Sequence, residues 1–183
     1  MVSSTYVGGF IRALRSQALL TAGFEAKLGP ALRAMVASPY AQSWWDGALT
    51  EQIVTLVLQE HGPDRLEEAG FFTTRNSVGP IITPLISVIG AIFGLRPSTL
   101  LERVVDLTST SVRGVELSWT STSETTGRLK IVYPSSHGGR LVEPLWRGSC
   151  RFIFEISKTI GKITESKVDG SAVTLTLSWD AKR

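Results

Sequence analysis

Hydrophobic residues recur with helical spacing through the first third of the chain. Phe10, Leu14 and Ala18 fall on one apolar stripe within residues 6–36, and charged side chains fall outside that stripe. Gly29-Pro30 breaks this helical run, and "ALRAMVAS" adds another turn or two after it. Residues 43–63 show the same period, with Ser43 as a candidate N-cap and a Gly-Pro pair as the stop signal. The pattern therefore predicts a helical N-terminal half.

Two further helices are predicted before the pattern changes. The stretch "PDRLEEAGF" opens with a proline, which suits the first helical turn. The stretch "RPSTLLERVVDL" has Thr99 and Glu102 at the spacing of a capping box. Both segments present an apolar side, so we expect them to pack on the rest of the chain.

The C-terminal half alternates between polar and apolar residues, which is typical of strands. The segments "VRGVELSW" and "GRLKIVYP" predict one hairpin, and "KITESKV" and "SAVTLTLSW" predict a second one with a turn at Asp169-Gly170. The helix predicted between them is "WRGSCRFIFEISKTIGK". We therefore predict an α+β fold in which the helical half packs on a four-stranded antiparallel sheet of ββαββ order, as a single domain over residues 1–183.

Residues 77–95, "SVGPIITPLISVIGAIFGL", carry no charge. Their prolines favour a helix that begins at Pro84, capped by Thr83, and ends before Gly94. A helix from Leu85 to Phe93 is about 14 Å long, whereas a bilayer core is about 30 Å thick. We therefore predict a buried helix at the centre of the domain and no membrane span.

Charge and cysteine content narrow the function classes. The 183 residues carry a net charge of +3 with no run of basic residues, so no nucleic-acid partner is predicted. A single cysteine excludes a disulfide within the chain and a thiolate metal cluster. The first residues lack the pattern of a secretory signal, so we expect a cytoplasmic protein.

Five segments between about residues 40 and 180 are distinctive in pattern and spacing: "SWWDGALTEQIVTLVLQEHGPDRLEEAG", "GLRPSTLLERVVDL", "GRLKIVYP", "LWRGSCRFIFEISKTIGK" and "VTLTLSW". Together they resemble a large paralogous family from myxobacteria. The order of elements is also similar to the superfamily that unites vinyl-reductase-like, haem-nitric-oxide-binding and TRAPP-subunit proteins. This resemblance implies either a small or hydrophobic ligand held between helices and sheet, or a dimeric assembly subunit.

The chain departs from the cofactor-binding branches of that superfamily. The haem-binding branch uses an axial histidine and a Tyr-x-Ser-x-Arg motif, which is absent here; one tyrosine stands in "VYPSS". The vinyl-reductase-like branch carries Cys or His pairs, which one Cys and two distant His cannot reproduce. We therefore predict no cofactor and no metal site.

The favoured hypothesis is a non-enzymatic ligand-binding or regulatory domain, with an apolar pocket between the predicted helix at 84–93 and the sheet. The candidate lining residues are Trp44, Ile82, Leu85, Ile89, Phe93, Trp146, Cys150 and Phe154.

A second candidate site is an anion-binding loop at residues 137–140, because its glycines permit close backbone approach and its arginine could hold an anion. It comprises His137, Gly138, Gly139 and Arg140. A plain turn is the competing interpretation, since no helix is predicted to start directly after it.

Two other functions stay open at this point. Residues 1–38 could lie at an oligomer interface, and a homodimer could form through Phe10, Leu14 and Trp44. An enzyme with Cys150 as nucleophile is the third hypothesis, although Cys150 falls on an apolar helix face where a buried, inert thiol is more usual.

Overall fold

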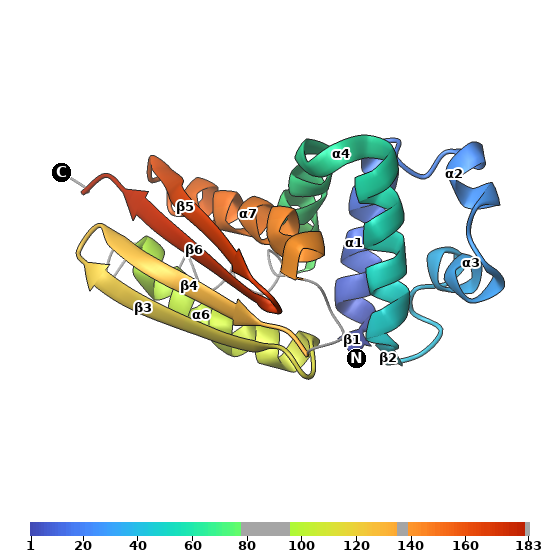
Figure 1. Ribbon diagram of the computed structural model, residues 1–183, viewed down its shortest axis with the longest axis horizontal. Coiled ribbons are helices and arrows are strands. Elements are labelled where there is room, and N and C mark those ends of the chain that lie inside the picture. Colours follow the sequence, from blue (N-terminus) through green and yellow to red (C-terminus); the bar gives the residue numbers. More distant parts are fainter. Residues whose placement is uncertain (78–95, 135–138, 182–183) are drawn as a thin grey trace.

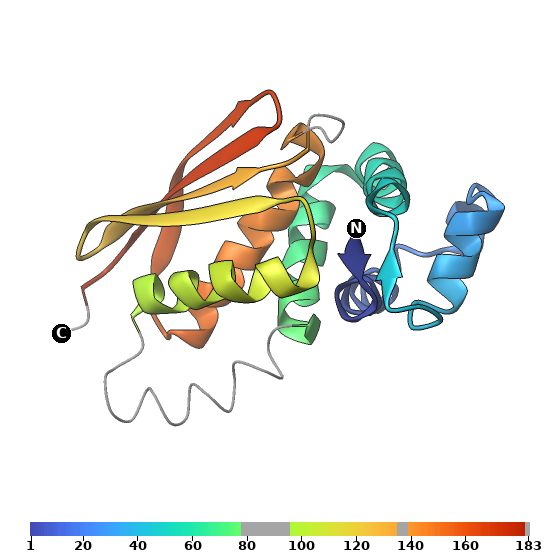
Figure 2. The same cartoon turned by 90° about the horizontal axis from the view of Figure 1, so that it is seen from below.

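A helical lobe and a sheet covered by helices make up the computed structural model, which describes residues 1–77, 96–134 and 139–181, apart from the side chains of Leu107 and Ser109 (Figures 1 and 2). The helices are α1 (Ser4–Ser16), α2 (Ala22–Ala26), α3 (Pro30–Ala37), α4 (Gly47–Ser77), α6 (Pro97–Ser111) and α7 (Gly139–Ile156). The strands are β1 (Val2–Ser3), β2 (Trp44–Trp45), β3 (Glu116–Ser123), β4 (Thr126–Val132), β5 (Gly161–Asp169) and β6 (Ala172–Trp179).

The large sheet has four antiparallel strands in the spatial order β3-β4-β6-β5, so β4 and β6 join the two hairpins. Along β6, Val173, Leu175 and Leu177 are fully buried, and the threonines between them face the other side. Helices α6 and α7 cover this buried face (Figure 2). The α+β class, the helical N-terminal half and the four-stranded antiparallel sheet are thus confirmed.

The second hairpin turns one residue later than predicted. Asp169 pairs with Ala172, so Gly170 and Ser171 form the turn. Gly170 has φ 57°, a left-handed conformation that glycine adopts without a steric penalty.

The N-terminal lobe contains three corrections to the predicted helices. The helical segment predicted within 6–36 breaks at Gly29-Pro30 as expected, where α3 begins, but it is also divided into α1 and α2, with Ala18 at φ 55° after α1. Trp44 and Trp45 do not open a helix but form β2, which pairs with β1. Helix α4 begins at Gly47, where Asp46 rather than Ser43 accepts a hydrogen bond from the backbone N–H of Ala48 at 3.0 Å.

Helix α4 is two helices joined at a kink. Gly62 has φ 79° and ψ 174°, a combination that is essentially restricted to glycine. This is the Gly-Pro stop predicted from the sequence, but the chain resumes helical structure immediately and continues to Ser77. Figure 1 shows the first arm beside α1 and the second beside α7.

Helix α7 also starts earlier than expected. It begins at Gly139 and ends at Ile156, and Gly161 already belongs to β5. A helix N-terminus therefore does follow directly on the 137–138 sequence, contrary to the interpretation of that loop as a turn without a following helix.

Side chains form two separate core clusters, one in the N-terminal lobe and one between the sheet and its helices. Phe10 and Leu14 belong to the first, with exposed fractions of 1% and 0%. They are buried within their own chain, so they offer no surface for the predicted homodimer. Among the described residues, no helix combines the length and hydrophobicity needed to cross a bilayer. The predicted helix at 84–93 lies outside the described residues.

Candidate functional site

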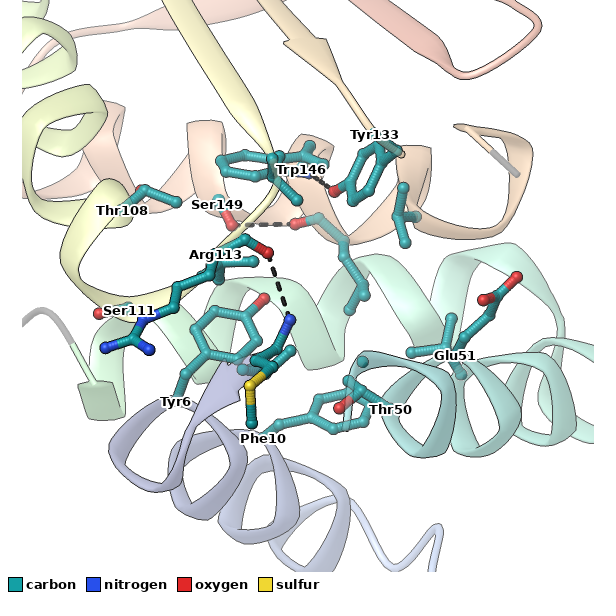
Figure 3. Close-up of a pocket in the computed structure, with 18 of the residues that line it drawn as sticks. Tyr6, Phe10, Thr50, Glu51, Thr108, Ser111, Arg113, Tyr133, Trp146 and Ser149 are labelled. Atoms are coloured by element: carbon teal, nitrogen blue, oxygen red, sulfur yellow. Dashed lines mark hydrogen bonds between the residues drawn. The ribbon is translucent and has the colours of Figure 1, made fainter. Parts of the chain in front are cut away.

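A cavity of about 200 Å³ lies where the two core clusters meet. Its walls come from β1, α1, both arms of α4, α6 and the segment after it, the end of β4, and α7 (Figure 3). Its apolar lining comes from both lobes and comprises Val2, Phe10, Val54, Val104, Val112, Val115, Val142 and Leu145. The cavity is thus a gap in packing between two cores, lined mainly by aliphatic side chains.

Tyr133 and Trp146 form the main polar pair of the cavity. The indole N–H of Trp146 donates to the Tyr133 hydroxyl oxygen (Figure 3). Burial raises the pKa of Tyr133 well above its ordinary value, so the phenol stays protonated. Because an indole can only donate, the direction of this bond is fixed.

Thr74 and Ser149 form a second polar pair, between α4 and α7. The Thr74 hydroxyl lies 2.7 Å from the Ser149 hydroxyl, and each also lies within 3.0 Å of a carbonyl oxygen one turn earlier in its own helix. Their hydrogen-bonding capacity is therefore largely used between the two helices, and they form a polar but neutral part of the wall.

Tyr6 and Thr50 add two hydroxyls from the N-terminal lobe. Burial raises the pKa of Tyr6 to about 12, so this phenol is also neutral at physiological pH. The Thr50 hydroxyl oxygen is fully buried and has no hydrogen-bond partner within the described part of the chain. The lobe thus presents two neutral hydroxyls toward the same space.

Three charged residues among those described also line the cavity. Asp46 and Glu51 lie at the start of α4, and Arg113 follows α6. The Arg113 guanidinium stacks over the Trp44 ring at 3.9 Å from its centroid. The backbone N–H of Arg113 donates to the Met1 carbonyl at 2.8 Å, which ties β1 to the end of α6. These contacts connect the two lobes beside the cavity.

The predicted pocket residues occupy different places. Trp146 lines the cavity, Trp44 lies beneath Arg113, and Cys150 and Phe154 are buried in the C-terminal core cluster. Burial raises the pKa of the Cys150 thiol to about 12. Four other candidates lie outside the described residues: Ile82, Leu85, Ile89 and Phe93.

The predicted anion loop is only partly described. His137 and Gly138 lie outside the described residues. Gly139 is buried at the start of α7, where an added Cβ would lie 3.2 Å from the Gly170 carbonyl oxygen. Arg140 is exposed. These two residues are placed by the packing of α7 against the second hairpin.

Sequence reasoning missed most of the polar lining. Tyr6 and Tyr133 are 127 positions apart, and neither forms a motif with its neighbours that predicts a shared cavity. The available signal for Tyr133 was its place in "VYPSS", at the end of a predicted strand. Thr74 and Ser149 carried no signal, because single hydroxyls on helices are usually exposed or bonded to their own backbone.

Comparison with solved structures places this fold beside H-NOX proteins. The chain matches the Fe(II) unliganded H-NOX protein from K. algicida with a TM-score of 0.65 at 10% identity, covering 98% of this chain and 97% of that one. It matches a mutant of T. tengcongensis H-NOX with a TM-score of 0.58 at 15% identity, covering 98% of both chains. No family model and no curated protein matched the sequence.

These matches cover nearly the whole chain, so the shared feature is the complete fold and not one motif. The similarity to the haem-nitric-oxide-binding branch is therefore confirmed at the level of fold. The similarity to the paralogous myxobacterial family stays a prediction from the sequence.

Proposed function

We propose that this chain is a ligand-binding domain with the H-NOX fold that takes a small neutral molecule, and not haem, into the cavity between its two lobes. The single observation that supports this most directly is the cavity itself, a space of about 200 Å³ with aliphatic walls and neutral hydroxyls. Pockets for small ligands have this composition, an apolar surface with a few placed polar groups.

The size of the cavity favours a small ligand. Drug-sized molecules occupy pockets of about 300–1,000 Å³, and haem is larger than most of them. A dry apolar cavity of about 150 Å³ in another protein is sufficient for benzene. A space of about 200 Å³ therefore suits a single ring with a short substituent, or a short branched chain.

The residues around the cavity also do not fit haem. Its described lining contains no histidine, and His61 is engaged elsewhere, with a ring nitrogen 3.3 Å from the Leu19 carbonyl oxygen. The Tyr133 hydroxyl oxygen already accepts a hydrogen bond from the indole N–H of Trp146.

The sequence at the end of β4 supports the same conclusion. Residues 133–137 read Tyr-Pro-Ser-Ser-His, which keeps the Tyr and Ser of Tyr-x-Ser-x-Arg and has His where that motif has Arg. A histidine does not offer the two parallel donors by which arginine grips a carboxylate such as a haem propionate. This chain thus has the same order of elements as the haem-binding proteins but lacks the arginine that would bind a haem propionate.

We further propose that the domain acts by binding and not by catalysis. Cys150 is the one cysteine of the chain. Its exposed fraction is 1%, and burial raises the pKa of its thiol to about 12, so the reactive thiolate is suppressed. Homodimer formation and a cytoplasmic location stay predictions from the sequence.

The first test is haem titration with an absorbance readout, together with native mass spectrometry of the purified protein. We expect no saturable Soret shift at one equivalent of hemin, and either the bare chain mass or a small adduct that is lost on denaturation. Stoichiometric hemin binding would contradict the proposal.

A second test blocks the cavity. Thr108 lines it and donates to the Val104 carbonyl at 2.7 Å. Thr55 makes the equivalent bond to Glu51 at 2.8 Å, but does not line it. We expect benzene to raise the Tm of the wild type and of Thr55→Trp, but not of Thr108→Trp. An equal benzene effect in all three proteins would place binding elsewhere.

A further inference from the structure

The two tyrosines of the cavity have hydroxyl protons that the described residues do not accept. We propose that Tyr133 and Tyr6 donate hydrogen bonds to a carbonyl oxygen of the ligand, which makes the ligand class small neutral carbonyl compounds with an apolar body, such as aryl ketones, esters or lactones. This inference rests on the proposed function and specifies the chemistry of that cavity.

Tyr133 is the stronger donor of the two. Its oxygen already accepts the indole N–H of Trp146, so its own proton points elsewhere, and no described residue accepts it. A hydroxyl that accepts one hydrogen bond is polarised and donates a better second one. The Trp146–Tyr133 pair is therefore a preorganised donor toward an acceptor in the cavity.

Tyr6 offers a second donor from the opposite lobe. Its hydroxyl makes no hydrogen bond with any described residue, and Figure 3 shows the side chain directed into the space between the helices. Thr74 and Ser149 are less available, because they bond to each other and to carbonyls of their own helices. Tyr6 and Tyr133 therefore each keep an O–H proton for a group in the cavity, which favours a ligand that accepts.

The charges around the cavity favour a neutral ligand over an anion. Figure 3 shows the Arg113 guanidinium turned away from Tyr133, and this group stacks on Trp44. Asp46 and Glu51 bring carboxylates to the lining. A ligand carboxylate would lose its hydration among aliphatic walls and beside two acidic residues, which is costly.

The experiment uses three probes that share a benzene ring: acetophenone, ethylbenzene and benzoate. Their Kd values are measured by ligand-observed NMR on the full chain, for the wild type and for Tyr133→Phe, Tyr6→Phe and Tyr40→Phe. Tyr40 is the matched control, since it is 57% exposed and does not line the cavity. A thermal melt of each variant establishes that it is folded.

We expect acetophenone to bind the wild type about tenfold more tightly than ethylbenzene, as one to two net hydrogen bonds would give. Tyr133→Phe and Tyr6→Phe should each weaken acetophenone binding several-fold and leave ethylbenzene binding unchanged, while Tyr40→Phe changes neither. Tyr6→Phe removes no described hydrogen bond, so this variant is the decisive one if Tyr133→Phe proves unstable.

The other outcomes separate the two proposals. Equal binding of acetophenone and ethylbenzene, or tighter binding of benzoate, would contradict the proposal that the ligand is a neutral carbonyl compound. Either result would still agree with the proposal that the cavity binds a small molecule. Loss of acetophenone preference in Tyr40→Phe would overturn the assignment to the cavity tyrosines. Failure of every probe to bind the wild type would overturn the proposed function itself.

Discussion

Gly70 of α4 and Gly148 of α7 lie at one helix crossing, where each lets the other helix's backbone come into contact. A Cβ at Gly148 would lie 1.9 Å from the Glu67 carbonyl oxygen, and one at Gly70 would lie 2.2 Å from that of Leu145. Real Cβ atoms do not approach backbone atoms so closely, so the two helices can cross at this distance only because both positions are glycine. The same crossing positions Thr74 opposite Ser149 in the cavity wall.

Replacing Gly148 with alanine should therefore separate α4 from α7. We expect Gly148→Ala to lower the free energy of unfolding by about 3 kcal/mol, because the obstacle is rigid backbone and not a flexible side chain. Urea unfolding measures the change. The control is Gly23→Ala, where the nearest atom would be 3.9 Å away; it should change stability by less than about 1 kcal/mol. Similar values for both variants would show that the helices are not in close contact.

Glu67 links the same two helices by charge. Its carboxylate lies 2.8 Å from Arg147 Nε and 3.2 Å from an Arg151 nitrogen. We expect Glu67→Gln to cost about 1 kcal/mol at low salt and less at high salt, since these partly exposed pairs are screened. Glu60→Gln removes the more isolated pair with Lys27, at 2.6 Å, and should cost less. A larger loss for Glu60→Gln in urea unfolding would contradict this ranking.

The Cys150 thiol should be unreactive in the folded protein. Burial raises its pKa to about 12, so almost no thiolate exists near neutral pH, and access is blocked as well. Labelling with a disulfide reagent at pH 8 is expected to proceed only as fast as the chain unfolds, and to become rapid in urea. Fast labelling without denaturant would revive the hypothesis of a nucleophilic cysteine.

Alkaline pH should destabilise the fold through Tyr6. Its pKa is about 12 in the folded chain against an ordinary value of 10.0, so the unfolded chain releases the proton first. The contribution of the protonated Tyr6 phenol to the free energy of unfolding is complete below about pH 10 and is lost as the pH rises toward about 12. The free energy of unfolding falls with a limiting slope of about 1.4 kcal/mol per pH unit. Urea unfolding of Tyr6→Phe between about pH 8 and 11 should show a shallower decline than the wild type. Parallel declines would assign the loss to other groups.

Local sequence patterns were sufficient to predict the four-stranded sheet but not the two-residue pairing of β1 with β2. Strand β6 shows strict alternation because one face is buried and the other is not, and this periodicity is visible in the sequence. Strand β2 has two residues, and it exists because Val2 and Ser3 lie beside Trp45 and Trp44. A pairing of two residues with two distant residues is too short to produce a hydrophobic periodicity in either segment.

The cavity could not be predicted for a related reason. The apolar stripe of α1 was identified from Phe10 and Leu14, but the stripe alone does not tell whether it meets the same chain or another. The hydroxyls that face the cavity come from helices whose relative position depends on Gly70 and Gly148. Helix packing of this kind is a property of the assembled fold, and it becomes visible only in three dimensions.

The kink at Gly62 lets both arms of α4 line the same cavity. Thr50 and Val54 on its first arm and Thr74 and Ser77 on its second all line the cavity. The first arm, from Gly47 to the kink, is about 22 Å long, so a rotation of about 5° at the kink would move its far end by about 2 Å. A molecule that changed the angle between the two arms would therefore also shift the start of α4 relative to its second arm.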